Sequence, residues 1–234
     1  MNALRGLKLI ALGGALSAVA ACSTAPPPPP VMERPAVFTP LGLDATYLSG
    51  DVIGTRRARA AKLHAAGVRP IGAGADLSYV AATDVELRRQ TAGMGLDVMR
   101  VGDGIVIRIP ASLTFDTNSS VVKPQFDATL LEIARTVKNS RQTYVDVLAH
   151  TDTSGGAPYN QSLSDRRASA VAAFLVRHGV ARARIASRGL GESAPLYAAE
   201  TDETQRAANR RVEIRLVPYR ASDAPATGAR RRRS

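Results

Sequence analysis

The chain has 234 residues and a formal net charge of +11, and it contains a single cysteine and no tryptophan. Such a basic balance favours an anionic partner, which can be nucleic acid, an anionic membrane face or an acidic polymer. Aromatic residues make up only 4% of the chain, which argues against a surface on which nucleic-acid bases stack. A single cysteine excludes a disulfide within the chain.

Residues 1 to 22 have the pattern of an export signal. They comprise a positive start with Arg5 and Lys8, an apolar stretch from residue 7 to residue 20 and the ending Val19-Ala20-Ala21-Cys22. The ending resembles a bacterial lipobox, which implies that Cys22 becomes the lipidated first residue of the mature chain. By the same resemblance, Ser23 is typical of lipoproteins sorted to the outer membrane. The alternative is a small buried thiol inside an uncleaved segment.

The next segments differ sharply in composition. Pro26 to Pro30 predict a stiff polyproline spacer within a linker from residue 22 to residue 35. Residues 36 to 82 are rich in Ala, Gly and Arg, and only residues 56 to 66 favour a short basic helix. At the other end, residues 219 to 234 predict a disordered tail with Arg230 to Arg233, for which a phosphate or lipid headgroup contact is the alternative.

A compact domain is expected from residue 83 to residue 218. Its first helix is predicted to begin at Thr83, with Glu86 at the third helical position, and to run to residue 91. The remaining predicted elements are strands at 97–100 and 105–109, a helix at 124–138, a strand at 143–149, a helix at 161–178 that ends at Gly179, and strands at 184–188 and 211–217. This alternation indicates an α+β fold.

Arg167 has an unusual position in the predicted long helix. At about 100° per residue, it projects into the centre of the apolar side formed by Leu163, Ala170, Val171, Phe174 and Leu175. An unpaired buried charge costs several kcal/mol, so Arg167 needs a fixed carboxylate or an acidic ligand group. Asp152, just past a predicted strand, is the nearest candidate. These residues alone leave open either a buried ion pair or an open groove, and the adjacent Gly155-Gly156 loop favours the groove.

Catalytic patterns receive little support. The three histidines are scattered without an HExxH motif, so no metal site and no cofactor are expected. Ser154, His150 and Asp152 offer the residue types of a catalytic triad but lack a nucleophile elbow. No pair of acids suited to glycoside cleavage stands out. A binding protein is therefore expected rather than an enzyme, with His150 packed at the end of a strand.

A set of motifs occupies the second half of the chain. They are Phe115-Asp116, His150-Thr151-Asp152, Gly155, Asn160, Leu163-Ser164, Arg167-Ala168, Val171, Gly189 to Glu192, Pro195 and Asn209 to Ile214. Together they resemble the OmpA-like peptidoglycan-binding domain, over a core of residues 104 to 218. The resemblance implies a β/α sandwich with helices on one face of a mixed four-stranded sheet, after a flexible, lipidated N-terminal region.

The resemblance also implies a ligand and the residues that hold it. The ligand is the peptidoglycan stem peptide, recognised through meso-diaminopimelate, a zwitterion that a carboxylate and a guanidinium can bind as a complementary pair. Asp152 and Arg167 match the primary roles. Thr151, Asn160, Asp116 and Arg210 match secondary positions in the groove. As alternatives, Asn160 is an expected helix N-cap, and Asp116 and Arg210 support their loops.

The expected protein is thus an outer-membrane lipoprotein whose domain faces the periplasm and tethers the membrane to the wall. The lipid on Cys22 is its expected anchor, and nucleic acid is not an expected partner. The alternative is a scaffold whose basic segments bind anionic headgroups and whose domain binds another envelope protein instead of the wall.

Overall fold

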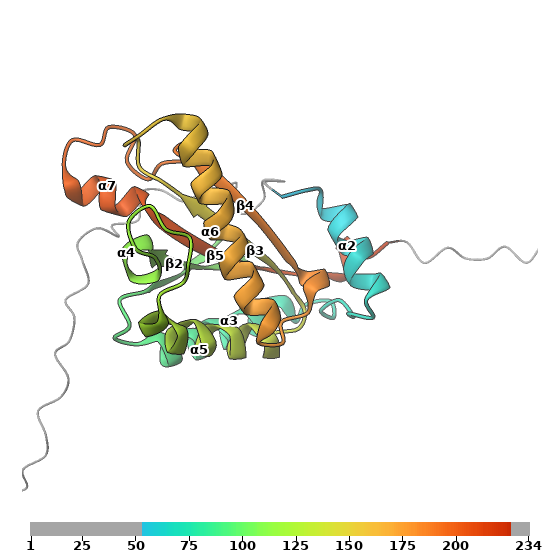
Figure 1. Cartoon of the computed structure of the whole chain (residues 1–234). Coiled ribbons are helices and arrows are strands. Elements are labelled where there is room, and N and C mark those ends of the chain that lie inside the picture. Colours follow the sequence, from blue (N-terminus) through green and yellow to red (C-terminus); the bar gives the residue numbers. More distant parts are fainter. Residues whose placement is uncertain (1–52, 226–234) are drawn as a thin grey trace, which may run out of the picture. The chain divides into compact units, whose positions relative to one another are not determined.

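The computed structural model describes residues 53–225 (Figure 1). The predicted signal, Cys22, the proline spacer and the tail with Arg230 to Arg233 lie outside the described residues. Within residues 53–225, none of the helices combines the length and the apolar character needed to cross a bilayer.

The centre of the fold is one mixed sheet of five strands in the order β1-β2-β5-β3-β4. Its strands are β1 Asp97–Val101, β2 Gly104–Pro110, β3 Thr143–His150, β4 Ile185–Gly191 and β5 Arg211–Pro218. Only β3 and β4 pair in parallel; the other neighbours are antiparallel. The expected sheet of four strands is one strand too small, because β1 and β2 form a hairpin around Gly102 and Asp103 and both join the sheet.

Helices and short 3-10 turns connect these strands. The helices are α2 Arg56–Ala65, α3 Asp76–Thr91, α4 Ala111–Thr114, α5 Asp127–Asn139, α6 Ala157–Arg177 and α7 Glu203–Asn209, and the turns are η2 Pro124–Phe126, η3 Arg182–Arg184 and η4 Ala221–Asp223. The predicted α+β class is confirmed, and so is the short basic helix, which is α2.

The two faces of the sheet are covered by different helices. Side chains alternate along a strand, so Ile107 and Ile214 point to one face, where they form the main core with residues of α3, α5 and α6 (Figure 1). Val106 and Val217 point to the other face and pack with Leu63 of α2. The expectation of helices on one face therefore holds for the three long helices but not for α2.

Two helices begin earlier than the sequence predicted. Helix α3 starts at Asp76, so Thr83 lies within it rather than at its N-terminus. Helix α6 starts at Ala157, where Pro158 suits the first turn because a first-turn amide has no intrahelical acceptor to lose. Its predicted end is confirmed at Gly179, which has φ 92°, a left-handed value that glycine adopts without strain. The division of the chain into signal, linker, domain and tail stays a prediction.

A close contact between β4 and α6 positions the N-terminal half of α6 beside the end of β3. A Cβ on Gly189 would lie 2.2 Å from the backbone nitrogen of Asp165, so only glycine fits. The contact is closed by hydrogen bonds, because Gly189 N donates to Asp165 Oδ1 at 2.8 Å and Gly191 N donates to Ser164 Oγ at 2.9 Å. This contact directs Arg167 toward the carboxyl end of β3.

Candidate ligand-binding groove

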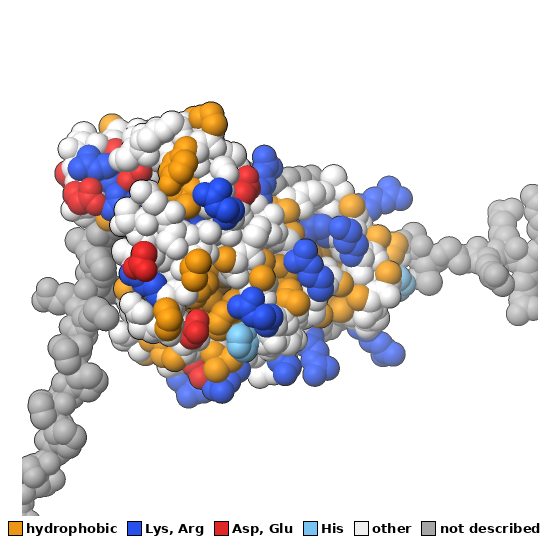
Figure 2. Space-filling model, in the orientation of Figure 1, with side chains coloured by type: hydrophobic (Ala, Val, Ile, Leu, Met, Phe, Trp, Pro, Cys, Tyr) orange, Lys and Arg blue, Asp and Glu red, His pale blue; other side chains and the backbone are white. Residues whose placement is uncertain are grey.

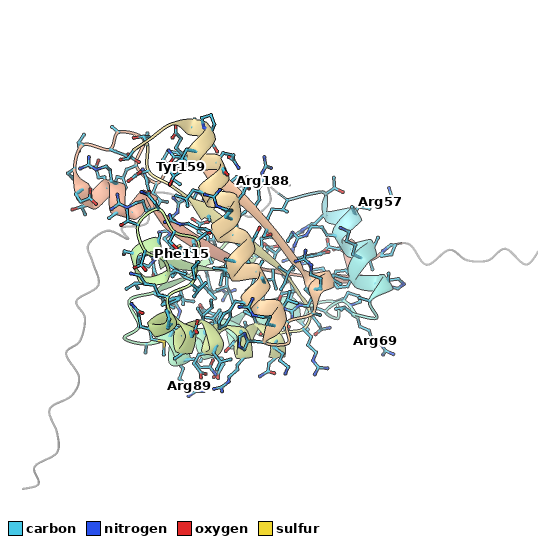
Figure 3. The ribbon with its side chains drawn as sticks, viewed as in Figure 1. Arg57, Arg69, Arg89, Phe115, Tyr159 and Arg188 are labelled. Carbon is cyan, nitrogen blue, oxygen red and sulfur yellow. The ribbon has the colours of Figure 1, made fainter. Side chains whose placement is uncertain are left out.

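A groove of about 440 Å³ lies beyond the carboxyl end of β3, bordered by α4, α6 and α7. It contains all six residues proposed from the sequence, although they come from four separate segments. Its lining is Ala111, Ser112, Phe115, Asp116, Thr117, Asn118, Thr151, Asp152, Ser154, Tyr159, Asn160, Leu163, Arg167, Glu203 and Arg210. Figure 3 labels Phe115 and Tyr159, which come from two of the segments that border the groove.

Asp152 is a buried carboxylate, 6% exposed, at the first turn after β3. Its Oδ2 accepts a hydrogen bond from Arg210 Nη1 at 2.5 Å, and its Oδ1 accepts one from the backbone nitrogen of Ser154 at 3.1 Å. Arg210 also donates to Glu203 through Nη2. The ion-pair partner of Asp152 is therefore Arg210, fifty-eight positions away in sequence. Asp152 and Arg167 form no ion pair within residues 53–225, and the partial neutralisation expected between them is limited to a longer-range electrostatic attraction.

Arg167 is 5% exposed and has no carboxylate within ion-pair distance among residues 53–225. Its Nε donates to the carbonyl of Ser119 at 2.8 Å and its Nη2 to that of Asp116 at 3.4 Å. The guanidinium carbon lies 5.1 Å from the centre of the Phe115 ring, a cation–π distance. Burial lowers the pKa of Arg167, yet an arginine stays protonated in proteins. The groove thus holds a buried cation whose hydrogen bonds go only to neutral carbonyls.

Two secondary residues, Asn160 and Thr151, are buried but differ in their side-chain hydrogen bonds. Asn160 lies inside α6, with Gly156 as the N-cap, so the alternative N-cap role is wrong. Its Nδ2 donates to the carbonyl of Asp152 at 3.2 Å and to Glu192 Oε2 at 2.6 Å. Thr151 is 3% exposed, and its hydroxyl has no hydrogen-bond partner in the described part of the chain.

Asp116 contributes to the groove in an unexpected way. Its carboxylate is 78% exposed and lies 3.2 Å from Lys123 Nζ, while its carbonyl accepts from Arg167. The loop that carries it therefore supports Arg167 through backbone oxygens. Asn118 in the same loop has φ 58°, a left-handed conformation that asparagine tolerates better than most residues.

Three contributors to the groove were not proposed as site residues. Phe115 supplies the ring beneath Arg167, Tyr159 lines the groove from α6, and Glu203 shares Arg210 with Asp152. Phe115 belonged to the motif set but carried no role. The sequence shows Glu203 only as an acid in the first turn of a helix, after the N-cap Asp202. This pattern does not predict that α7 lies near the end of β3.

The residue types of a catalytic triad are not assembled. The His150 ring is 1% exposed, and its Nε2 lies 3.9 Å from Glu213 on β5. Burial lowers the pKa of His150 to about 3, so the ring is neutral near pH 7. Ser154 meets Asp152 through its backbone nitrogen rather than its hydroxyl. His150 is thus a packed residue at the end of a strand, as predicted.

Comparisons with known proteins agree with this fold and its motifs. The chain is 36% identical over 213 residues to "Probable lipoprotein YiaD" of Escherichia coli K12, which covers 88% of this chain and 94% of that protein. The solved "cell wall anchor of the T6SS from Pseudomonas aeruginosa" shares 28% identity with a TM-score of 0.51, over 56% of this chain and 96% of that one.

A solved "putative MotB like protein from Desulfovibrio vulgaris" shares the fold with a TM-score of 0.55 at 24% identity, over 61% of this chain and 95% of that one. The model of the OmpA family matches residues 114–210, the part of the chain that contains α5, β3, α6, β4 and α7. The chain therefore belongs to the OmpA family.

Proposed function

We propose that this protein binds peptidoglycan non-covalently, through the meso-diaminopimelate of the stem peptide, and tethers the outer membrane to the wall as a lipoprotein. One observation carries the proposal: Arg167 is a buried cation in an open groove and, within residues 53–225, its hydrogen bonds go only to carbonyls, while the carboxylate of Asp152 lines the same groove. Such a cation is stabilised strongly by an incoming carboxylate.

The groove matches the two ends of a zwitterion. The carboxylate of diaminopimelate binds Arg167, and its ammonium group binds Asp152. Asp152 is occupied by Arg210, but Arg210 has a second acid in Glu203. Arg210 can therefore stay on Glu203 while Asp152 accepts the ammonium, and neither carboxylate loses a cationic partner.

The names of two relatives support both halves of the tether. The Pseudomonas aeruginosa structure is described as a cell wall anchor, and the Escherichia coli relative is described as a probable lipoprotein. Lipidation of Cys22 and a periplasmic orientation rest on the sequence pattern of residues 1 to 23. A single stem peptide binds weakly in this proposal, and many tethers on one polymer gain from effective concentration.

The test is co-sedimentation of the purified chain from residue 22, with Cys22→Ser, on diaminopimelate-type sacculi. Asp152→Ala and Arg167→Ala should each remain folded by circular dichroism and stay in the supernatant. Arg166→Ala is the matched control, because Arg166 is the exposed neighbour on the same helix and, in the described part of the chain, its side chain hydrogen-bonds to Ser162 alone.

Sedimentation of Arg166→Ala together with loss of the other two variants supports the proposal. If the wild-type chain stays in the supernatant, or if folded Arg167→Ala sediments as well as the wild type, Asp152 and Arg167 are structural. The scaffold that binds another envelope protein then becomes the better explanation.

A further inference from the structure

A second charged surface lies at the end of α6 that is remote from the groove. Helix α6 has 21 residues, so it is about 30 Å long at 1.5 Å per residue. Asn160 and Arg167 line the groove in its N-terminal half, whereas Arg177 ends the helix beside η3. The two surfaces therefore lie at different ends of the same helix.

Seven exposed or partly exposed cations gather at this remote end, which we call the basic end. They are Arg57 and Lys62 on α2, Arg69 after α2, Lys138 at the end of α5, Arg141 before β3, Arg177 at the end of α6 and Arg182 in η3. Arg69 and Arg141 line one shallow hollow, and α2 lies against η3. Lys138 packs over Gly179. Figure 2 shows blue side chains on the side that carries α2 and the C-terminal end of α6.

Several acids near the basic end are paired with other arginines, whereas Asp127 lines a hollow together with Arg177. Asp103 and Asp223 bind Arg56, at 3.4 and 3.7 Å, and Asp146 binds Arg59 at 3.0 Å. Arg220 binds Asp76 at 3.0 Å. The seven cations of the basic end make no ion pair within residues 53–225, so no salt bridge in this part of the chain neutralises their charge.

Acidic side chains gather near the groove instead. Glu200, Asp202 and Glu203 lie on or beside α7, where Figure 2 shows red side chains. Because charges on opposite sides of a domain are separated by more than a Debye length of about 8 Å at physiological salt, the groove's acids do not screen the basic end. The two ends of the domain therefore differ: beside α7 acids and arginines pair, because Glu203 binds both Arg206 and Arg210, whereas the basic end carries cations that form no ion pair within residues 53–225.

We propose that the basic end binds the anionic phospholipid surface of the membrane. Each lysine or arginine near such a surface raises partitioning about fivefold at physiological salt, so several cations on one face act together. The apolar side chains of α2, Ala60 and Leu63, are buried against the sheet. The contact is therefore electrostatic and does not require insertion. Binding of the basic end to lipid does not depend on the proposed function. Only the orientation of the domain rests on it, because a groove that binds the wall leaves the basic end facing the lipid.

The test is co-sedimentation with vesicles of phosphatidylcholine alone, and with vesicles of equal parts phosphatidylcholine and phosphatidylglycerol. The protein is the chain from residue 22 with Cys22→Ser, and Arg230 to Arg233 are replaced by serine to remove the contribution of the tail. We expect binding to the anionic vesicles only, and a decrease in binding as salt is raised. The double variant Arg69→Glu/Arg141→Glu should reduce partitioning by about tenfold or more.

The matched control is Arg88→Glu/Arg89→Glu, which makes the same charge change on the last turn of α3. It should bind the anionic vesicles nearly as well as the parent chain. Equal losses in the two double variants, or full vesicle binding by Arg69→Glu/Arg141→Glu, would overturn the proposal. Inorganic phosphate is added as a competitor at concentrations that change the ionic strength little. If it displaces the protein from the vesicles, the surface binds free anions and not a bilayer, and the proposal is overturned.

A parallel sacculus assay separates this proposal from the proposed function. Arg69→Glu/Arg141→Glu should sediment with sacculi as the parent chain does, and Asp152→Ala should still bind anionic vesicles. Loss of sacculus binding in Arg69→Glu/Arg141→Glu with vesicle binding retained would assign the basic end to the wall and contradict the membrane proposal. Failure of Asp152→Ala to lose sacculus binding would affect only the proposed function.

Discussion

At the scale of single residues, Arg167 combines burial with access to the groove. Two of its nitrogens are occupied by the carbonyls of Ser119 and Asp116, which hold the guanidinium plane over Phe115. Its Nη1 makes no hydrogen bond to any residue between 53 and 225. A planar group fixed in this way can present its remaining donor to a ligand without losing further side-chain entropy.

Arg167→Lys should separate charge from geometry. A lysine keeps the positive charge, but its single ammonium cannot reach both carbonyls and a ligand carboxylate in the arrangement that the guanidinium uses. We expect a folded protein whose affinity for a diaminopimelate-containing muropeptide falls by about tenfold, or about 1.4 kcal/mol. Isothermal titration calorimetry measures this, with Arg166→Lys as the control. Unchanged affinity would show that only the charge at residue 167 matters.

Thr151→Val should have opposite effects on stability and binding. The Thr151 hydroxyl is buried without a hydrogen-bond partner in the described part of the chain, so its removal relieves a desolvation cost of about 1 kcal/mol or more. We expect a higher midpoint in urea unfolding and weaker sedimentation with sacculi, because the hydroxyl is then absent from the groove. A less stable variant would indicate that the hydroxyl has a structural partner.

At the scale of elements, the contact between β4 and α6 determines where the groove residues lie. Asp165 and Ser164 on α6 accept hydrogen bonds from the backbone nitrogens of Gly189 and Gly191. The helix is therefore bound to the sheet through the backbone of β4 as well as through its apolar side. This close approach depends on the missing side chain at residue 189.

Gly189→Ala should move α6 away from β4. The new methyl group would lie 2.2 Å from the backbone nitrogen of Asp165 and 2.4 Å from Ser164 Oγ, so backbone atoms must shift. Overpacking of this kind costs about 1 to 3 kcal/mol, and the displaced helix should also weaken sacculus binding. Urea unfolding and co-sedimentation measure the two effects. Gly156→Ala is the control, because its Cβ would meet nothing closer than 3.9 Å.

At the scale of the whole molecule, charged side chains are buried on the face of the sheet opposite the main core. Glu213 is fully buried on β5, where it accepts from Arg211 Nε at 2.7 Å and from Arg215 Nη2 at 2.9 Å. His150 lies beside this cluster as a neutral ring. Because ionising a further group there is costly, global stability depends on the protonation state of this face.

Stability should fall as the pH drops below about 6.5, because His150 has a folded pKa of about 3 against an ordinary value near 6.5. In this range the unfolded chain binds a proton that the folded chain does not, which favours unfolding by about 1.4 kcal/mol per pH unit. We expect a loss of about 1.6 kcal/mol between pH 6.5 and pH 5, where most carboxylates are still ionised. Urea unfolding at several pH values measures this slope.

His150→Gln should flatten the profile between pH 6.5 and pH 5, whatever its effect on stability at pH 7. His64→Gln, which alters an exposed histidine on α2, should keep the wild-type slope. An unchanged slope in His150→Gln would show that another group controls the acid sensitivity of the fold.

The sequence by itself determined the five strands and the longer helices, but not α4 or α7. It also determined the apolar side of α6 with Arg167 at its centre, and the motifs that placed the six groove residues in one family. These features depend on periods of 3.6 and 2 residues and on local spacing, which are properties of adjacent stretches of chain. The predicted starts of α3 and α6 were too late because the first turns of both helices lack a strong apolar pattern.

Only the tertiary structure decided which charges meet. It paired Asp152 with Arg210 across fifty-eight positions, placed backbone carbonyls around Arg167, and set α2 on the second face of the sheet. It also brought cations on and after α2, between α5 and β3, and between α6 and η3 together at the basic end. A long charged side chain pairs with whichever partner the topology brings near. The local periodicity of the sequence contains no information about that partner.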